Sequence, residues 1–320
     1  MKKFLVEFWK SYSIVIVVIV IGLVLGLLAP RFLTKDNLIN VMTNASLVAI
    51  VGLGMTLAIA SGNFDLSVGA TASFAGCISF SLVPILGVPL SIIAGVIVGA
   101  VVGLINGLII SELRVPAFIA TLSMMTIVRG FTLIFTNGRD LYLFGQTEYK
   151  ILSGQLILGI STPIFFAIGI ALLFGFVKKY TRFGRHILAM GGNLSAASRS
   201  GVRTSFVLWG IFSIVGATAA LTGMIISSQV LTANARLATG LELSAIAVVI
   251  LGGTALSGGQ ATVIGTLLGA LLISMINNGL NLLNVPIFYQ ELTVGALMLG
   301  ALAVKMQKGF KISSLLRSRS

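Results

Sequence analysis

Apolar runs close to 20 residues long recur along the whole chain, and each could cross a hydrocarbon core of about 30 Å as a helix. Only 9% of the 320 residues are charged, whereas a soluble domain carries about 25%. The pattern predicts an all-α polytopic membrane protein. Ten spans are expected, at about residues 12–29, 38–61, 66–87, 90–110, 115–136, 156–177, 206–226, 241–256, 261–281 and 289–304.

The net charge of +13 is distributed as a topology signal. Loops on the cytoplasmic side of a membrane carry an excess of Lys and Arg. With the N-terminus inside, fifteen Lys and Arg fall in inner segments and five in outer loops. We therefore expect both termini in the cytoplasm and no nucleic-acid partner. The first apolar run is too long for a secretion signal, so we expect an uncleaved first span.

Two stretches of the chain match each other at a constant offset of 170 residues. Residues 94–122 align with residues 264–292, so that Gly95 meets Gly265 and a Val-Pro pair recurs. Five predicted spans separate the copies, so the second copy would run through the membrane in the opposite direction. This predicts an inverted repeat of five plus five spans, as many transporters have; chance matching among apolar helices is the alternative. We expect a single transmembrane domain over residues 1–320, with pseudo-repeats at about 1–150 and 151–304 and a basic cytoplasmic tail at 305–320.

Four glycines recur at a spacing of four residues within the first copy, which places them on one face of a helix. Without side chains on that face, a second helix can approach closely, and van der Waals contact holds the pair together. We therefore expect a packing face there and no substrate contact. The four are Gly95, Gly99, Gly103 and Gly107.

The sequence contains none of the motifs that carry catalytic or cofactor chemistry. It has no GxxxxGK[ST] phosphate loop, no dinucleotide fingerprint, no nucleophile–base pair and no metal-ligand cluster. The single cysteine, Cys77, lies within a predicted span, and the single histidine, His186, sits among arginines. We expect no catalytic residue, no metal and no cofactor in this chain. Its chemistry would be passage of a solute, and a partner chain would hydrolyse any ATP.

One inner loop, residues 178–205, is much longer than the others. Its segment from Asn193 to Ser200 can form a short helix, with Asn193 as N-cap and Gly201 in the position of a C-terminal glycine. An exposed, capped helix on the inner face would suit docking of another protein. A basic loop that merely faces anionic lipid headgroups is the alternative.

A second feature is the glycine-rich turn GGTALSGG at residues 252–259, which is followed by an apolar run with several asparagines. Asn277 and Asn281 are four residues apart and share a helix face. Their amides could bind a hydroxylated solute. They could equally cross-link neighbouring helices by hydrogen bonds.

These segments carry a resemblance. VGLGMTLAIASGNFDLSVGA, RVPAFIATLSMMTIVRG, TRFGRHILAMGGNLSAASRSGV and VVILGGTALSGG, in this order, resemble the membrane permease subunit of ribose-type bacterial ABC importers, which serve monosaccharides and autoinducer-2. The likeness runs from about residue 36 to 304. It implies a multi-pass protein of the bacterial cytoplasmic (inner) membrane that pairs with a second permease copy or paralogue. It also implies an ABC ATPase subunit, which holds ATP and Mg, and a periplasmic or lipid-anchored sugar-binding protein.

The resemblance also implies roles by position. The segment that couples to the ATPase would comprise Gly191, Gly192, Asn193, Ala196, Ala197, Ser200 and Gly201. Asp65, Leu66, Ser67 and Gly69 match the family's GGxDLSxG signature, and Gly252, Gly253, Thr254, Gly258 and Gly259 match its later glycine-rich turn. The glycine pair of the signature reads Gly62-Asn63 here, and the acidic residue usual after Asn193 is Leu194. These departures concern which ATPase and which sugar the chain serves.

Asp65 is the one charged side chain between Asp36 and Glu112. It falls between the second and third predicted spans, where it could cap free backbone N–H groups and face the positive end of the third helix. A direct contact with substrate or a proton is the alternative. The resemblance implies that the chain is the translocation subunit of an ABC importer for a monosaccharide, such as ribose or a similar pentose. The rival is an ion-coupled secondary transporter that uses Asp65.

Polar residues in or beside the spans mark a candidate translocation path. Arg129 is the one basic residue well inside a span, and we expect it to face the bundle or to extend toward water. The candidates for the path are Asn63, Asp65, Ser67, Asn106, Arg129, Thr254, Asn277 and Asn281. Charges in the outer loops could dock the binding protein or simply be solvated; they are Arg139, Asp140, Glu148, Lys150, Arg236 and Glu242.

Overall fold

The computed structural model describes residues 2–143, 147–157 and 159–286, and short pieces at 288–290, 292–293, 295–296 and 299–300. The helices are α1 (Lys2–Leu28), α2 (Lys35–Ala60), α3 (Val68–Glu112), α4 (Ala117–Thr136), η1 (Thr147–Leu152), α5 (Thr162–Tyr180), α6 (Arg182–Gly192), α7 (Leu194–Arg199), α8 (Thr204–Val230), α9 (Leu241–Leu251) and α10 (Val263–Leu282). The short strands are β1 (Leu141–Tyr142), β2 (Gln155–Ile157), β3 (Ile160–Ser161) and β4 (Thr232–Ala233); β1 pairs with β4 and β2 with β3, both antiparallel.

Within the described ranges, six helices are long and apolar enough to cross a membrane: α2, α3, α4, α5, α8 and α10. This confirms an all-α polytopic membrane protein. Half of the predicted span at 289–304 and the whole tail at 305–320 lie outside the described residues. The helix predicted at 241–256 ends early, at Leu251. Gly252 and Gly253 follow, and the φ of 90° at Gly253 is incompatible with a continuing helix.

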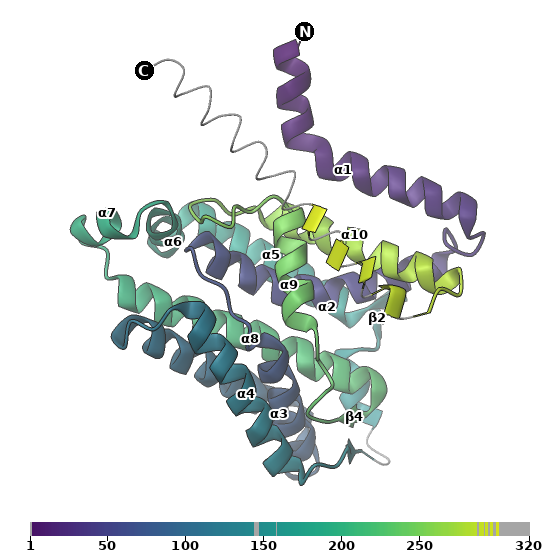
Figure 1. Cartoon of the computed structure of the whole chain (residues 1–320). Coiled ribbons are helices and arrows are strands. Elements are labelled where there is room, and N and C mark those ends of the chain that lie inside the picture. The colour runs from purple at the N-terminus through teal and green to yellow at the C-terminus, as the bar shows by residue number, and fades with distance from the viewer. Residues whose placement is uncertain are drawn as a thin grey trace.

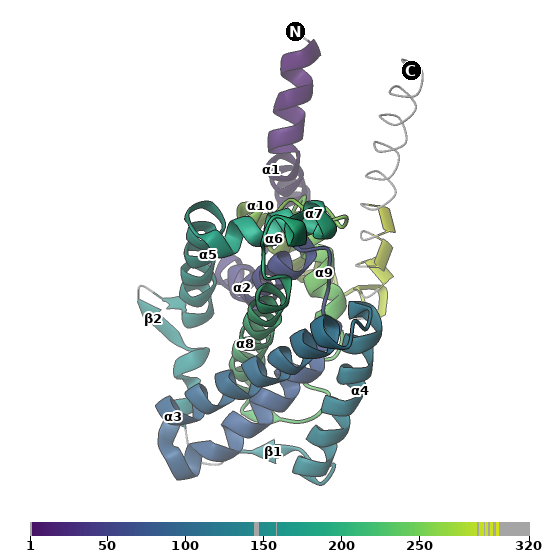
Figure 2. The same cartoon turned by 90° about the vertical axis from the view of Figure 1, so that its left-hand side faces the viewer.

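The helix α3 contains two of the predicted spans. It is interrupted at Gly87, whose φ of 74° lies in the left-handed region, between Pro84 and Pro89. Figure 2 shows the two arms of α3 meeting at a bend. Asn106, on the second arm, donates a hydrogen bond to Ser67, which directly precedes the first arm. The second arm therefore returns alongside the first, as a helical hairpin.

The four-glycine face of α3 packs against α8, as predicted. A Cβ at Gly103 would collide with the backbone carbonyl of Phe212, and one at Gly107 would lie 2.9 Å from the Cα of Trp209. The helix α8 also has a glycine at this interface, Gly216, where a Cβ would collide with the carbonyl of Gly99. Backbone therefore lies directly on backbone along this interface, which Figure 1 shows as the long pairing of α3 and α8.

The helix α2 lies at the centre of the bundle. It packs against α8, α10, α9 and α5, and 78% of its most apolar window is buried. From Leu47 to Ala60 its residues are apolar on all sides apart from Thr56, which is the composition of a core helix in a membrane bundle. The main hydrophobic cluster accordingly contains Ile50, Leu53, Met55 and Ile59 from this helix, together with apolar residues of α8 and α9.

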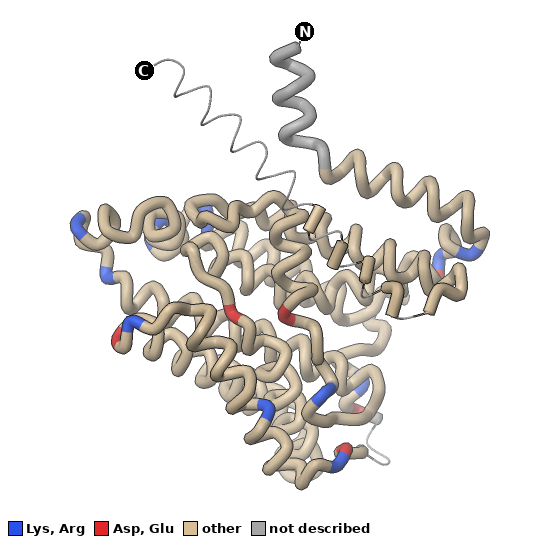
Figure 3. Tube along the Cα trace, in the orientation of Figure 1, with Lys and Arg blue, Asp and Glu red and all other residues tan. Residues whose placement is uncertain are grey.

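The outer helices expose large apolar side chains where a soluble protein would place polar ones. Leu27 on α1 is 85% exposed, Ile134 on α4 is 74% exposed and Leu172 on α5 is 71% exposed. Figure 3 shows Lys, Arg, Asp and Glu gathered mainly toward the ends of the bundle, with long stretches between that carry none. These faces are suited to contact lipid chains.

Candidate functional site

Asp65, Ser67 and Asn106 form one buried hydrogen-bond network where α2 ends and α3 begins. The Oδ1 atom of Asp65 accepts from the backbone N–H of Ser67 at 2.7 Å and from its hydroxyl at 2.6 Å. The Nδ2 atom of Asn106 donates to Oδ2 of Asp65 at 3.3 Å and to the Ser67 hydroxyl at 2.9 Å. The sequence suggested each residue separately, and the structure brings the three together.

Asp65 therefore takes part in the start of α3, but in a different manner from a simple N-cap. The N-cap position is held by Ser67, whose own side chain makes no capping bond within the helix. Asp65 lies two residues earlier and folds the chain into an Asx turn, since it accepts the N–H of Ser67. Its side chain is 1% exposed, so it does not lie at a boundary with water.

A second acidic side chain lies against the first turn of α3. The Oε2 atom of Glu242, in the first turn of α9, is buried and has no hydrogen-bond partner within the described ranges. A Cβ on Gly69 would collide with this oxygen and would lie 2.6 Å from the carbonyl of Ala238. Only a glycine at position 69 leaves room for the carboxylate. Glu242 was expected among docking charges, and its Oε2 is instead packed inside the bundle.

Residues 191–201, the coupling segment expected from the resemblance, have the local structure that their sequence predicts. The side chain of Asn193 accepts the N–H of Ala196 at 2.9 Å and caps α7. Gly201 follows the helix with a φ of 84°. Ala197 is buried, whereas the other residues of α7 are exposed. Figure 1 shows α7 projecting beside α6 from one end of the bundle.

The coupling segment is closely packed onto two other segments through Gly191. A Cβ there would collide with the carbonyl of Ala60, the last residue of α2, and with the backbone nitrogen of Gly259. The N–H of Gly259 donates to that same carbonyl of Ala60 at 2.9 Å. At the neighbouring Gly192 a Cβ would meet no atom within 4 Å. Three segments far apart in the sequence thus meet at one point.

The glycine-rich turn is closed by its own hydroxyl groups. The hydroxyls of Thr254 and Thr262 are 3.1 Å apart, and the N–H of Thr262 donates to the Thr254 hydroxyl at 3.2 Å. The Nζ atom of Lys178, at the end of α5, donates to the carbonyl of Ala261. Thr254 was expected in a translocation path, and these contacts give it a place in holding the turn together.

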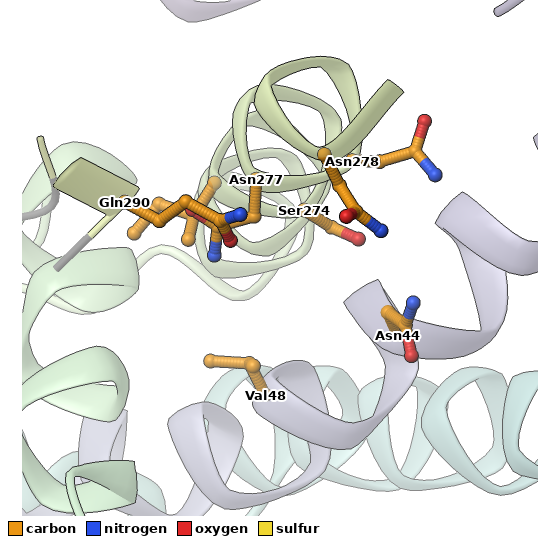
Figure 4. A pocket seen from close by; sticks show the side chains of 8 residues that line it. Asn44, Val48, Ser274, Asn277, Asn278 and Gln290 are labelled. Atoms are coloured by element: carbon orange, nitrogen blue, oxygen red, sulfur yellow. The ribbon is translucent and has the colours of Figure 1, made fainter. Parts of the chain in front are cut away.

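A cavity of 270 Å³ lies between α2 and α10, and we call it the amide cavity. Figure 4 shows side chains of α10 and of the segment after it bordering the same space as Asn44 and Val48 of α2. The apolar part of the wall is Val48 and Ile273. Its polar part consists of Asn44, Ser274, Asn277, Asn278, Asn281 and Gln290. Asn277 and Asn281, predicted to share a face, both line it.

Some polar groups of the amide cavity are already paired. Asn278 and Asn37 exchange two amide hydrogen bonds of 2.9 Å, which tie α10 to the start of α2. The Ser274 hydroxyl donates to the carbonyl of Val41 at 2.8 Å. The Oδ1 atom of Asn277, in contrast, is buried and has no partner in the described part of the chain.

The remaining candidates for the path lie elsewhere. Asn63 donates locally, to the carbonyl of Ser61 at 3.3 Å and to its hydroxyl at 3.1 Å. Arg129 is partly buried on α4, and its Nε has no hydrogen-bond partner within the described ranges. Neither residue belongs to the Asp65 network or lines the amide cavity.

Two of the loops with predicted docking charges meet at the end of the bundle opposite α7. The pairing of β1 with β4 brings the segment of Arg139 and Asp140 beside the segment of Arg236, and all three residues are exposed. Figures 1 and 2 place these strands far from α6 and α7. Glu148 and Lys150, on η1, are exposed as well.

Between these two exposed charges lies Tyr149, which sequence reasoning missed. It is fully buried, its hydroxyl lies 3.1 Å from that of Ser79, and its ring packs edge-on against Phe80 at 5.6 Å. The Ser228 hydroxyl donates to its carbonyl at 2.7 Å. Burial raises the pKa of the Tyr149 phenol above its ordinary value. An aromatic residue between two charged ones was the only signal in the sequence.

Comparison of the sequence with known proteins gives matches to membrane permeases that include all the segments described above. The family model described as the permease component of branched-chain amino acid transport systems matches residues 37–302. The ribose import permease protein RbsC of Escherichia coli K12 is 36% identical over 314 residues, which cover 96% of this chain and 97% of that protein. RbsC of Bacillus subtilis 168 is 39% identical over 296 residues and covers 90% of each chain.

The L-arabinose ABC transporter permease protein AraH of Azospirillum brasilense is 36% identical over 288 residues, or 90% of this chain and 85% of that protein. No solved structure matches the chain. Within the described residues, no group of three or more His, Cys, Asp or Glu could hold a metal ion. The family model and the relatives cover nearly the whole chain, which therefore belongs to the permease-component family of ABC transporters and is a multi-pass protein of the inner membrane.

Proposed function

We propose that this chain is the translocation subunit of an ATP-driven importer of a monosaccharide, with ribose or a similar pentose as substrate. As a permease component it is the membrane subunit, and a separate chain hydrolyses ATP. The observation that carries the proposal is the contact of Gly191 with Ala60 and Gly259. It connects the exposed α7 to the end of the central helix α2. The names of relatives, which include ribose, L-arabinose and D-allose permeases, support a sugar substrate.

We propose a topology of ten spans in an inverted repeat of five plus five, with both termini in the cytoplasm. The packing supports it. With the offset of 170, the α3 hairpin corresponds to α9 plus α10, and α8 corresponds to α2. The repeat then requires that α3 pack on α8 as α9 and α10 pack on α2, and both contacts occur. The helices α2 and α8 also pack on each other, as elements on either side of a pseudo-axis do.

We propose one partner for each end of the bundle. An ATPase subunit, with ATP and Mg bound, would receive α7 and the residues beside it, from Gly191 to Gly201. A periplasmic or lipid-anchored sugar-binding protein would dock at the opposite end, where Arg139, Asp140 and Arg236 are exposed on paired strands. A second permease copy or paralogue would complete the membrane part.

In this mechanism the ATPase supplies force and the permease supplies a path. Movement of α7 reaches the end of α2 through the backbone contact at Gly191, because no side chain lies between the segments to absorb it. The Asp65 network follows within five residues of Ala60 and fixes the turn into α3. A displacement of α2 would therefore be passed to the α3 hairpin as well.

The test is transport by purified components in liposomes. Permease, ATPase and binding protein together, with ATP, are expected to concentrate radiolabelled ribose inside the vesicles. Omission of ATP or of either partner should abolish uptake, and a protonophore should leave it unchanged. Ribose uptake by the permease alone, driven by an ion gradient, would contradict the proposal and favour a secondary transporter. The Asp65 network argues against that rival, since both carboxylate oxygens accept hydrogen bonds from within the chain.

A further inference from the structure

We propose that the amide cavity between α2 and α10 is the site where this subunit binds the hydroxyl groups of the sugar during passage. The assignment rests on the proposed function, because it presumes that a sugar crosses this chain. It goes beyond that function in naming the residues that meet the solute. These are Asn277 and Asn281 from α10 and Asn44 from α2.

The chemistry of the wall fits a neutral polyhydroxylated ring. Each asparagine amide offers both donors and acceptors, as a sugar hydroxyl does. Among the described residues no charged side chain lines the cavity, so none of them would balance the charge of a sugar phosphate or a sugar acid. Val48 and Ile273 add an apolar patch of the kind that packs against the C–H face of a ring. Six of the eight lining residues are polar, so the wall is more polar than that of a typical small-molecule site, as a solute rich in hydroxyl groups requires.

The size of the cavity matches a single sugar ring. Its volume of 270 Å³ lies just below the range of about 300–1,000 Å³ for sites that hold drug-sized ligands. A monosaccharide is smaller than such ligands, and a disaccharide approaches them. We therefore expect single sugars to be accepted and disaccharides to be excluded.

Unsatisfied hydrogen-bonding capacity distinguishes this cavity from a structural seam. The buried Oδ1 of Asn277 has no partner in the described part of the chain, although buried polar atoms are normally paired. Asn44 and Asn281 have exposed side chains on apolar helices, where bare lipid would be a poor neighbour for an amide. The pairing of Asn278 with Asn37 holds the two walls together without using these three amides.

The two halves of the chain differ at this place. The offset of 170 pairs Gly103 with Ile273 and Gly107 with Asn277. In the first half the two glycines let α3 and α8 touch through their backbones. In the second half larger side chains stand at both positions and border the cavity. The cavity thus lies where the second copy of the repeat lacks the glycines that allow close helix packing in the first copy.

The cavity is also connected to the coupling segment through a single helix. Ala60, which touches Gly191, and Asn44, which lines the cavity, are both on α2. Sixteen residues separate them, about 24 Å along a helix. Between them the hydroxyl of Thr56 lies 2.7 Å from that of Thr266 on α10. A shift of α2 driven from its end at Ala60 would therefore change the distance between the two walls.

The experiment uses the complete importer in liposomes and measures ribose uptake and ATP hydrolysis in the same sample. The variants are Asn277→Leu and Asn44→Leu, which remove an amide at nearly constant size. Asn40→Leu is the matched control, because Asn40 is an exposed amide one turn earlier on α2 that does not line the cavity. Asn277→Gln restores an amide at the first position. Size-exclusion chromatography records whether each complex still contains two permease copies.

We expect Asn277→Leu and Asn44→Leu to lower the ribose carried per ATP by about tenfold, the effect of one to two lost hydrogen bonds. ATP hydrolysis stimulated by loaded binding protein should stay within about twofold of wild type, since no coupling contact is touched. Asn40→Leu should match wild type, and Asn277→Gln should recover part of the uptake.

Two outcomes would overturn the assignment while leaving the proposed function intact. One is unchanged ribose per ATP in both cavity variants. The other is loss of the second permease copy from the complex, which would show that the amides hold a subunit interface. A wild-type importer that carries none of ribose, L-arabinose and D-allose would instead refute the proposed function, and the cavity assignment with it.

Discussion

Replacement of Asp65 separates a structural carboxylate from one that takes part in transport. Asp65→Asn keeps an acceptor at Oδ1 for the N–H and hydroxyl of Ser67. It also adds a donor beside Asn106, whose Oδ1 is buried and has no partner in the described part of the chain. An amide pair can then replace the bond from Asn106 to the carboxylate. Asp65→Leu removes the acceptor from all of these donors.

The two substitutions should therefore lower the free energy of unfolding by different amounts. A buried donor that loses its acceptor costs about 1–3 kcal/mol. In Asp65→Leu the backbone N–H of Ser67 is orphaned outright, its hydroxyl also loses its acceptor, and the Asn106 amide keeps only its bond to the Ser67 hydroxyl. We therefore expect a loss of roughly 2–5 kcal/mol for Asp65→Leu, summed from one full penalty at the N–H and partial penalties at the hydroxyl and the amide. For Asp65→Asn we expect a change of about 1 kcal/mol or less.

The assay compares thermal unfolding of each purified variant with ribose uptake at matched membrane levels. Asp65→Asn should melt close to wild type and retain most of its uptake. Asp65→Leu should melt earlier and accumulate poorly in the membrane. If Asp65→Asn abolished uptake while its melting temperature stayed unchanged, the negative charge itself would be required. The assignment of Asp65 to the turn before α3 would then be wrong.

Three further substitutions test the close packing of two glycines and the cap of α7. Gly191→Ala places a methyl group against Ala60 and Gly259. ATP hydrolysis should then continue, while the ribose carried per ATP should fall several-fold. Gly192→Ala is the control: it has open space around it and should match wild type. Gly103→Ala should lower stability by about 1–3 kcal/mol through overpacking against α8, seen as a lower melting temperature, and equal melting would contradict the packing. Asn193→Ala should cost α7 about 1 kcal/mol and weaken stimulation of the ATPase; Asn193→Asp should restore it.

The features predicted correctly from the sequence are those with local causes. The cap at Asn193 and the glycine at Gly201 define a helix within nine residues, so no distant partner is needed to form it. The glycine face of α3 is likewise visible as a spacing of four. Long apolar runs predict spans because lipid requires every backbone group to be paired within the segment.

The features that were missed depend on distant partners. The burial of Tyr149 depends on Ser79 and Ser228, which lie about 70 and 79 residues away. The meeting of Gly191 with Ala60 and Gly259 joins three segments that no local pattern connects. The early end of α9 is a different case. Gly252 and Gly253 are plain in the sequence, but an apolar count that runs across them extends the helix too far.

The two halves of the bundle differ in how closely their helices pack. In the first half, backbone contact between α3 and α8 leaves no space for a solute and makes the pair move as one body. In the second half, α10 departs from that pattern at Ile273 and Asn277, and a polar cavity opens against α2. The helix α2 belongs to both, since it packs on α8 and on α10 and ends under Gly191. In the proposed mechanism, a force on residues 191–201 would therefore act on the interface of α2 with α10 through a helix that also packs on α8.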